Sequence, residues 1–395
     1  MYELKIPGPD LRVFVVTRYD DIRAICQDVE TFGNAPNPKA WRWGDTDAEV
    51  AAIYRREGWP LDTILTFSDP PAHTRQRKLS ERAFLPRRME TAAVHVQSVV
   101  DELIDAFAAD GRVEFMSAFA RKLPIRVITH QFGLPKENAE FALETTNAMA
   151  AMIDMSYPRE VLLQGVHTVC KFQHLLAANI ERLREHPEET LFSDLVNAKV
   201  EGEPTFGMQE LLSICLLILG AGTESSGGVI AWAIYELACR PELADELRRS
   251  PEKVGAFTEE LLRLHSSVPG SYRTVRKDAE LHGVKMPQGS VVMIRWDGAN
   301  LDPTQFENPM QLDIARSNRR QHATFGLGLH YCMGNLLARK EIELSVKTLL
   351  RRFDKIELGA PKEQIEPIAA LNYHVLAELP LELRQPTRGL SNRSG

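Results

Sequence analysis

The stretch that decides the fold of this chain reads Phe325-Gly326-Leu327-Gly328-Leu329-His330-Tyr331-Cys332-Met333-Gly334. It places one cysteine between glycines, directly before a segment with helical periodicity. Because glycine permits backbone angles and close approaches that other residues forbid, such a loop can hold a sulfur atom against one flat object. Backbone N–H groups at the start of a helix stabilise a thiolate there. The stretch therefore indicates a cysteine that binds a metal ion as its thiolate.

Three other interpretations of Cys332 are open at this point. A lone cysteine is usually a small buried hydrophobe. A zinc site would use His322, His330 and Cys332, but the chain shows no paired Cys-x-x-Cys or His-x-x-x-His spacing and no clear fourth ligand. A dinucleotide-binding loop would begin at Gly326-x-Gly328, but Tyr331 stands where its third glycine belongs.

The complete ten-residue pattern favours a fourth interpretation, because it resembles the haem-binding loop of the cytochrome P-450 family. In that resemblance Cys332 is the metal ligand, the axial thiolate of heme b (iron protoporphyrin IX), which directs electron density toward O–O cleavage. The resemblance also implies that the cofactor-binding residues of the loop are Phe325, Gly326, His330 and Gly334.

Four further segments match the family in order and spacing, so the resemblance covers nearly the whole chain. One is Ala221-Gly222-Thr223-Glu224-Ser225, which is similar to the oxygen-activation segment of the family's long central helix. Ala221 leaves room above the iron, and Glu224 and Ser225 are the implied catalytic residues that relay protons. Most family members carry threonine where Ser225 stands, and serine lacks the methyl group that restrains the rotamer. The peroxide-driven branch has arginine and proline at this acid–alcohol pair, so dioxygen with external electrons is expected here.

The resemblance implies that two other segments, and a histidine three residues before the loop, supply cations for the haem propionates. His73 and Arg77, in the stretch 69–77, lie four residues apart and therefore on one helical face. The resemblance adds Arg273 and His322 at family propionate positions. Charge-assisted hydrogen bonds from these four groups would neutralise two buried carboxylates.

The fourth segment is Glu260-Leu261-Leu262-Arg263, which resembles the family's Glu-x-x-Arg ion pair. The family usually adds an arginine from a Pro-x-Arg-Phe segment, but here Gln311 occupies that place. Arg316 is a candidate substitute. We expect the pair to be buried and to brace the haem-loop side of the fold.

The chain has 395 residues, of which 44% are hydrophobic and 26% are charged, as in a globular protein with a sizeable core. No low-complexity linker, charge block or repeat divides it, so we expect a single domain over 1–395. The net charge of −7 argues against a nucleic-acid partner. The cysteines are odd in number and lack paired spacing, which favours a reducing cytoplasm over a disulfide framework. They are Cys26, Cys170, Cys215, Cys239 and Cys332.

The chain shows no signal peptide, because residues 1–7 lack an apolar stretch. Residues 211–235 are long enough to span a membrane and carry Glu224 as their only charge. An ionisable group at the bilayer centre is costly, and glycines and hydroxyl residues surround it. We therefore predict a central buried helix, no membrane anchor and a cytoplasmic location.

The fold class predicted from the pattern is mainly α with a smaller β portion, which the resemblance makes the P-450 fold, with a long central helix over the haem and the cysteine loop below. The β-rich portions are expected near 1–35, 265–300 and 370–385. Residues 31–67 show no regular pattern and are expected to be irregular. Strands are predicted at 13–17, 279–284, 291–295 and 375–383. Helices are predicted at 19–28, 73–83, 86–109, 118–132, 136–152, 159–184, 208–239, 241–250, 251–264 and 335–353.

These features imply a monomeric haem-thiolate monooxygenase that inserts one oxygen atom of O₂ into a hydrophobic small molecule. Two alternatives stay open: a haem-thiolate enzyme without net oxygen insertion, which Ser225 keeps under consideration, and a non-catalytic haem sensor. The chain begins where related proteins have usually completed a first helix. Candidate substrate contacts are Trp41, Trp43, Trp59, Leu217, Ala221, 268–271 and 371–373.

No flavin or iron–sulfur domain is fused to the chain, so electrons are expected from a ferredoxin and its ferredoxin reductase. An acidic ferredoxin would dock on basic residues near the cysteine side of the haem. The candidates are Arg75, Lys78, Arg82, Arg87, Arg88, Arg319, Arg320, Arg339 and Lys340.

Overall fold

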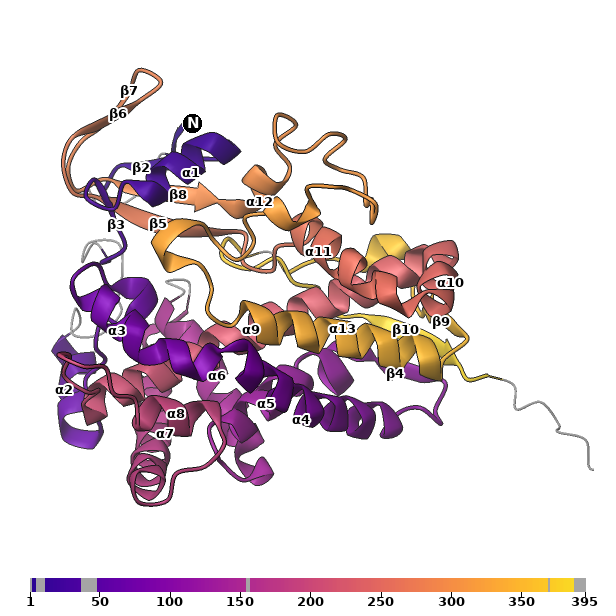
Figure 1. The fold of residues 1–395 in the computed structure, drawn as a ribbon, viewed down its shortest axis with the longest axis horizontal. Coiled ribbons are helices and arrows are strands. Elements are labelled where there is room, and N and C mark those ends of the chain that lie inside the picture. Colours follow the sequence, from indigo (N-terminus) through magenta and orange to yellow (C-terminus); the bar gives the residue numbers. More distant parts are fainter. Residues whose placement is uncertain (1, 5–10, 37–47, 154–156, 369, 387–395) are drawn as a thin grey trace, which may run out of the picture.

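The computed structural model describes residues 2–4, 11–36, 48–153, 157–368 and 370–386. Helix α9 (Met208–Cys239) runs through the middle of the molecule (Figure 1). Its N-terminus is capped because Glu210 accepts the backbone N–H of Gly207 at 3.0 Å. Helices α5 (Lys122–Gln131), α7 (Arg159–Glu185) and α13 (Asn335–Arg352) pack against it. The long apolar stretch is thus a core helix of the fold.

Of the described residues, only α9 is long and apolar enough to cross a membrane, a test of length and composition that buried core helices also pass. Most of its residues from Leu211 to Leu237 are buried in this structure. The other helices are α1 (Tyr19–Gln27), α2 (Ala48–Glu57), α3 (Ala72–Ser80), α4 (Pro86–Asp105), α6 (Ala139–Ile153), α8 (Leu191–Val196), α10 (Pro241–Arg249), α11 (Val254–Leu264) and α12 (Trp296–Asn300).

A five-stranded sheet lies beside this helical part, with strand order β1-β2-β8-β5-β3 (Figure 1). Strand β2 pairs in parallel with β8, with Val13 opposite Val291, and the other pairs are antiparallel. Its strands are β1 (Tyr2–Leu4), β2 (Val13–Val16), β3 (Phe32–Gly33), β5 (Gly270–Val275) and β8 (Val291–Arg295). A second sheet has the order β4 (Arg112–Glu114), β10 (Pro380–Arg384), β9 (Lys355–Leu358).

The mainly α fold class is confirmed, and most predicted elements are present within a few residues. The predicted helix 208–239 and the strand 291–295 have the observed bounds. The strand predicted at 279–284 is wrong: the segment forms a hairpin of β6 (Ala279–Leu281) and β7 (Val284–Met286). His282 and Gly283, both with positive φ, make the two-residue turn between them.

Two further predictions need correction. The irregular segment 31–67 contains α2, a short strand and a short 3-10 helix, Leu65–Phe67. The strand predicted at 375–383 is limited to β10, which begins at Pro380, and before it only Leu376 forms an isolated bridge, with Pro367. Strand β5 is not predicted from the sequence, because Gly270 and Arg273 interrupt the apolar pattern.

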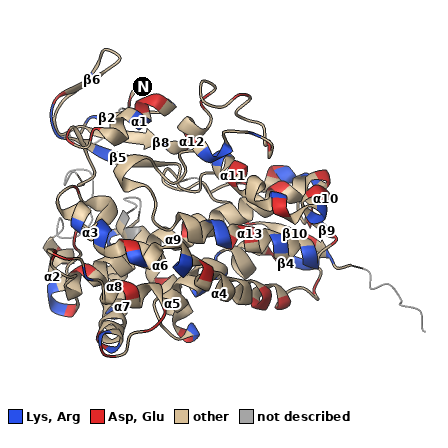
Figure 2. Ribbon diagram, viewed as in Figure 1, with Lys and Arg blue, Asp and Glu red and all other residues tan. Residues whose placement is uncertain are grey.

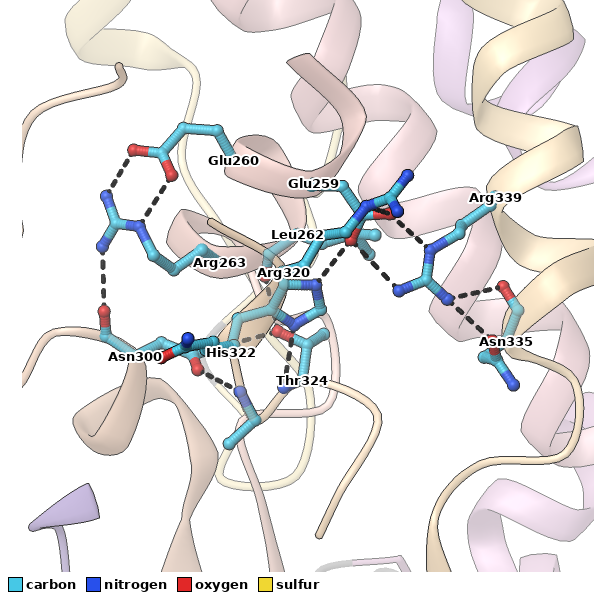
Figure 3. Close-up of polar contacts among 12 residues, drawn as sticks. Glu259, Glu260, Leu262, Arg263, Asn300, Arg320, His322, Thr324, Asn335 and Arg339 are labelled. Carbon is cyan, nitrogen blue, oxygen red and sulfur yellow. Dashed lines mark hydrogen bonds and ion pairs between the residues drawn. The ribbon is translucent and has the colours of Figure 1, made fainter. Parts of the chain in front are cut away.

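A buried ion-pair network joins α11 to the chain that leads into the cysteine loop. Both side chains of the Glu260–Arg263 pair are fully buried, with two hydrogen bonds of 2.9 and 2.8 Å (Figure 3). Arg316 Nε donates to Glu260 Oε1 at 3.0 Å, so Arg316 is the third partner. The backbone carbonyl of Gln311, not its side chain, accepts from Arg263.

Candidate functional site

The cysteine loop is closed by backbone hydrogen bonds and by two glycines in the left-handed region. Cys332 N–H donates to the Phe325 carbonyl at 2.8 Å, and α13 begins three residues later. Gly326 and Gly328 have φ of 75° and 72°. A Cβ atom at Gly328 would lie 2.7 Å from the Cys26 carbonyl oxygen, so the loop packs directly on α1 there. The predicted need for glycine is thus confirmed at both positions.

The surroundings of the Cys332 sulfur have opposite effects on the pKa of its thiol. Burial raises the pKa of the thiol, while hydrogen bonds from the backbone of Gly334 and Asn335 and the charges of Arg77 and Arg339 act to lower it. Burial has the larger effect, so the free thiol holds its proton more firmly than usual. A coordinated metal ion deprotonates a thiol outright, and the N–H groups and the two arginines would then stabilise the thiolate.

Three of the predicted cofactor residues converge beside this loop. His73 on α3 lies against His330 of the loop, with ring centroids 4.1 Å apart. Burial is the first cause that lowers the pKa of His330, to about 3, and the neighbours His73, Arg273 and Arg77 add to it. Arg77, one turn after His73, donates to the Tyr331 carbonyl at 2.8 Å. The pKa of His73 is also lowered, first by burial and then by the charge of Arg77.

Several buried polar groups near Cys332 lack a hydrogen-bond partner, or a carboxylate partner, among the residues that the structure describes. His73 Nδ1 and both ring nitrogens of His330 are buried without a hydrogen-bond partner. Arg273 is only 5% exposed, yet it donates to the Ser271 hydroxyl, the Tyr272 carbonyl and the Cys26 sulfur, none of which is a carboxylate. Burial lowers the pKa of Arg77 and of Arg273. Imidazole nitrogens without partners, a buried arginine and a half-buried arginine around a cysteine fit a flat group that carries an iron ion and two carboxylates.

His322 lies in a different environment from the other three predicted propionate ligands. Its Nε2 atom is 3.1 Å from Glu259, and its Nδ1 accepts the Thr324 N–H at 3.3 Å (Figure 3). Arg339 Nε also donates to Glu259 at 2.7 Å, and its guanidinium lies 4.5 Å from the Phe325 ring centroid. Contact of His322 with the cofactor stays a prediction.

Glu259 is the residue of this site that sequence reasoning missed. Burial alone raises the pKa of its carboxyl, but hydrogen bonds from His322 and Arg339 outweigh that effect and lower the pKa to about 2. The acid therefore ties α11, the start of the cysteine loop and α13 together. Its only signal in the sequence is a second acid directly before Glu260, which a surface position explains equally well.

The predicted oxygen-activation segment forms the middle of α9. Ala221 is exposed and Gly222 half-buried although the helix is otherwise mostly buried, so a free surface is present at this turn. The Ser225 hydroxyl donates to the Ala221 carbonyl at 2.6 Å, which leaves its oxygen free to accept. Glu224 is half-buried and acts on Tyr373, whose pKa is raised first by burial and then by this acid.

The structure gives two of the predicted substrate contacts different surroundings. Residues 371–373 lie near Glu224 through Tyr373, which supports their place at the site. Trp59 instead is fixed to α7, because the Gln173 side chain bonds both its N–H and its carbonyl, at 3.0 and 2.8 Å. Trp41 and Trp43 lie outside the described residues.

The sequence model of the family described as Cytochrome P450 matches residues 45–254 and 254–383. The chain belongs to the cytochrome P450 family. The family binds heme b and inserts oxygen from O₂ into hydrophobic substrates with electrons from a separate redox partner, and this chain is a bacterial-type monooxygenase of that kind. The interpretations as zinc site, dinucleotide loop and sensor are thereby set aside.

Similar proteins come from several bacteria. "Cytochrome P450(MEG)" from Priestia megaterium is 30% identical over 353 residues, covering 89% of this chain and 84% of that protein. "6-deoxyerythronolide B hydroxylase" from Saccharopolyspora erythraea is 31% identical, covering 94% and 90%. The structure of the polyketide-synthase P450 PksS of Bacillus subtilis 168 superposes with a TM-score of 0.84 at 30% identity, covering 97% and 93%. P450BioI bound to a fatty-acyl carrier protein also gives 0.84, at 26% identity, covering 97% and 94%.

Proposed function

We propose that Cys332 is the axial ligand of the haem iron and that Glu224 and Ser225 deliver protons during oxygen insertion. The observation that carries this assignment is the convergence of Cys332 with the buried Arg273, the half-buried Arg77 and the imidazoles of His73 and His330, which have no carboxylate hydrogen-bond partner among the described residues. Bound haem supplies the activation of O₂. Around it, Arg77 and Arg273 would bind the propionates, as would His73, while Gly326 would let the loop approach the ring closely.

The test of the ligand is spectroscopic. The reduced, CO-bound protein should show the red-shifted Soret band of thiolate ligation, and Cys332→His should abolish it while haem is retained. Cys170→Ser is a matched control, because that thiol is also buried but lies in the α7 contact with Gly58. An unchanged band in Cys332→His would overturn the assignment. Incorporation of ¹⁸O from ¹⁸O₂ into product separates oxygen insertion from isomerisation or coupling chemistry.

The proton roles follow from hydrogen bonds within α9. Since the Ser225 hydroxyl already donates to the Ala221 carbonyl, its oxygen can accept a proton from a neighbouring donor, and it can give its own proton to the reaction side only when that helix bond breaks. Glu224 is the adjacent acid and is half-buried, so it can exchange protons with solvent. A general acid–base relay commonly contributes a factor of about 10²–10⁴ in rate, so Glu224→Gln should slow turnover clearly.

We also propose that a ferredoxin, reduced by its ferredoxin reductase, docks on the side of the cysteine loop. Basic residues mark α3 and the start of α13 in one view (Figure 2). Several predicted docking cations already have partners: Arg75 pairs with Glu210, Arg88 with Asp194, and Arg339 with Glu259. Arg82 and Arg87 are exposed, and no ion pair is recorded for them among the described residues. The docking role therefore falls mainly on these two.

Charge reversal tests the docking site. Arg82→Glu and Arg87→Glu should slow reduction by the ferredoxin, most strongly at low salt, because complementary charge steers encounter and is screened by ions. Lys285→Glu, on the exposed β6–β7 hairpin, is the matched control and should leave the rate unchanged. Substrate binding should be the same in all three. Equal reduction rates in every variant and at every salt concentration would place the donor elsewhere.

We further propose that the protein is a cytoplasmic monomer with a single domain and without a membrane anchor. The largest apolar cluster has members from Val50 to Leu383, which supports a single domain, although the five-stranded sheet has separate clusters that include Phe14 and Val13. Sedimentation with haem bound tests the oligomeric state. For the substrate, we propose a binding screen with two arms. A relative named 6-deoxyerythronolide B hydroxylase and one named for polyketide biosynthesis suggest polyketides, and a neighbour bound to an acyl carrier protein suggests fatty acyl chains, free or carrier-bound. Displacement of the haem water, seen as a spectral shift, identifies the class that binds.

A further inference from the structure

The sulfur of Cys26, in α1, lies between two parts of the site that are far apart in the sequence. Cys26 is only 4% exposed, and Arg273 Nη2 donates to its Sγ atom at 3.8 Å. The same sulfur accepts the backbone N–H of Leu327 in the cysteine loop. Since Arg273 belongs to β5, one side chain joins α1, β5 and the loop. Cys26 can therefore act on the buried cation and on the loop together.

The hydrogen bonds of Arg273 determine which of its donors stay free. A guanidinium has five N–H groups in a fixed planar fork. Nη1 donates to the Ser271 hydroxyl at 3.3 Å and to the Tyr272 carbonyl at 2.8 Å, and Nη2 gives one N–H group to Cys26. The Nε–H group and the second N–H group of Nη2 remain, and neither has a recorded acceptor among the described residues.

The two donors that remain on Arg273 form the edge of the fork that matches a carboxylate. Arg263 uses the same edge in this protein, because its Nε and Nη2 atoms donate to the two oxygens of Glu260 at 2.9 and 2.8 Å (Figure 3). Two parallel bonds of this kind fix the geometry as well as add energy. The bond to Cys26 holds the plane of the Arg273 guanidinium while leaving this edge open.

A thiol differs from the acceptors that usually orient a buried arginine, because it carries no charge. Burial raises the pKa of the Cys26 thiol, and the opposing effects of Arg273 and of the Leu327 N–H are smaller. The sulfur is therefore neutral at pH 7 and accepts from Arg273 without cancelling its charge. An acid at this position would pair with Arg273 and compete with any other anion. The charge of Arg273 thus stays available to a bound carboxylate.

We propose that Cys26 is a positioning residue, which directs the free edge of Arg273 toward one haem propionate and holds the cysteine loop against α1. This rests on the proposed haem-thiolate function and adds α1 to the elements that bind the cofactor. The main chain supports the same contact, because a Cβ atom at Gly328 would lie 2.7 Å from the Cys26 carbonyl oxygen. Both the side chain and the backbone of Cys26 therefore contact the site.

The test is a double-mutant cycle that measures haem transfer to apomyoglobin and the midpoint potential of the haem iron. Cys26→Ala should speed haem transfer by about 2- to 10-fold, the range that one net hydrogen bond gives. It should also lower the midpoint potential, because a propionate that is less well paired favours the ferric state. Cys26→Ser should recover most of both changes, since a hydroxyl also accepts from Arg273. In an Arg273→Lys background, which lacks the fork, Cys26→Ala should change both quantities much less.

The outcomes separate this proposal from the function on which it rests. Wild-type transfer rate and potential in Cys26→Ala, equal changes in Cys26→Ser and Cys26→Ala, or an undiminished effect in the Arg273→Lys background would each overturn the positioning role. A wild type without the thiolate Soret band would instead refute the proposed function. Cys170→Ala is the control for loss of a buried thiol, since Cys170 is 1% exposed in α7, and it should change neither quantity. If Cys26→Ala does not fold, Cys26→Val fills the space without an acceptor and replaces it in the cycle.

Discussion

Arg263→Ala is predicted to be among the most destabilising single substitutions in the chain. The fully buried guanidinium of Arg263 donates to both oxygens of Glu260 and to the carbonyls of Asn300, Pro309 and Gln311, at 2.7 to 3.0 Å. Removing one partner of a buried ion pair commonly costs about 3–5 kcal/mol, because the other charge is left without compensation. Arg316 remains bonded to Glu260 and limits that loss, while the three carbonyls lose a donor, so we expect about 3–5 kcal/mol in total.

Arg316→Ala removes less, because Glu260 keeps both bonds to Arg263. We expect about 1.5–3 kcal/mol, the value of a hydrogen bond to a charged group. Arg184→Ala is the matched control: Arg184 and Glu181 have the same three-residue spacing, but their side chains are 37% and 59% exposed. Such a surface pair contributes at most about 1 kcal/mol.

Urea unfolding followed by circular dichroism, at one saturating haem concentration, measures all three free energies of unfolding. The reasoning predicts the order Arg263→Ala, Arg316→Ala, Arg184→Ala from largest to smallest cost. A cost for Arg263→Ala no larger than that of the surface control would refute it. If Arg263→Ala yields no folded protein, Arg263→Lys should show an intermediate cost, because lysine keeps the charge but lacks the fork of donors.

Three further predictions concern the site. Because the pKa of Glu259 is lowered to about 2, its ionised carboxylate stabilises the fold above the pKa of about 4.3 that the residue has when unfolded. This stabilisation is lost as the pH falls toward 2. Glu259→Gln should therefore flatten the pH dependence of the free energy of unfolding between these two values, measured by urea midpoints. Ser225→Ala should raise the fraction of electrons lost as hydrogen peroxide and Ser225→Thr should lower it or leave it unchanged, and wild-type coupling in Ser225→Ala would remove the hydroxyl from the mechanism. Gly328→Ala should weaken haem retention, because the new Cβ atom would lie 2.7 Å from the Cys26 carbonyl oxygen. Gly289→Ala is the control, since Gly289 has a similar positive φ but open space around its Cβ position. It should cost only the backbone strain of about 1–2 kcal/mol and leave the haem content unchanged.

The sequence predicted best where one signal was long and bounded. Helix α9 has the predicted ends because its apolar run lies between Gly207 and the Arg240–Pro241 step. The β6–β7 hairpin was merged into one strand because its turn needs only two residues. Arg316 could be named as a candidate but not placed, since its contact with Glu260 crosses 56 residues of chain.

The same difference between a clear sequence signal and a dependence on packing applies to the residues of the candidate site. The family motif located Cys332, His73, Arg77 and Arg273 in the sequence, and the structure brings them together. The environment of Glu259 depends instead on how α11 and α13 pack against the chain before the cysteine loop. An acid inside a helical pattern looks like a surface residue until its neighbours in space are known. Burial and partner choice are therefore the part that the sequence leaves undetermined.

The attachment of Trp59 to α7 gives this protein a built-in optical reporter. The Gln173 side chain holds both main-chain groups of Trp59, the His174 ring binds the Glu57 carbonyl at 2.8 Å, and any side chain on Gly58 would collide with Gln173. The indole also lies 5.1 Å from the His174 ring, a neighbour whose protonation changes indole emission. A displacement of α7 carries the end of α2 with it, whereas a break between them separates the indole from its quencher. Because the chain has five tryptophans, the measurement needs a variant in which Trp59 is the one that remains. In that variant, time-resolved fluorescence during ligand mixing distinguishes joint movement of the two helices from their separation.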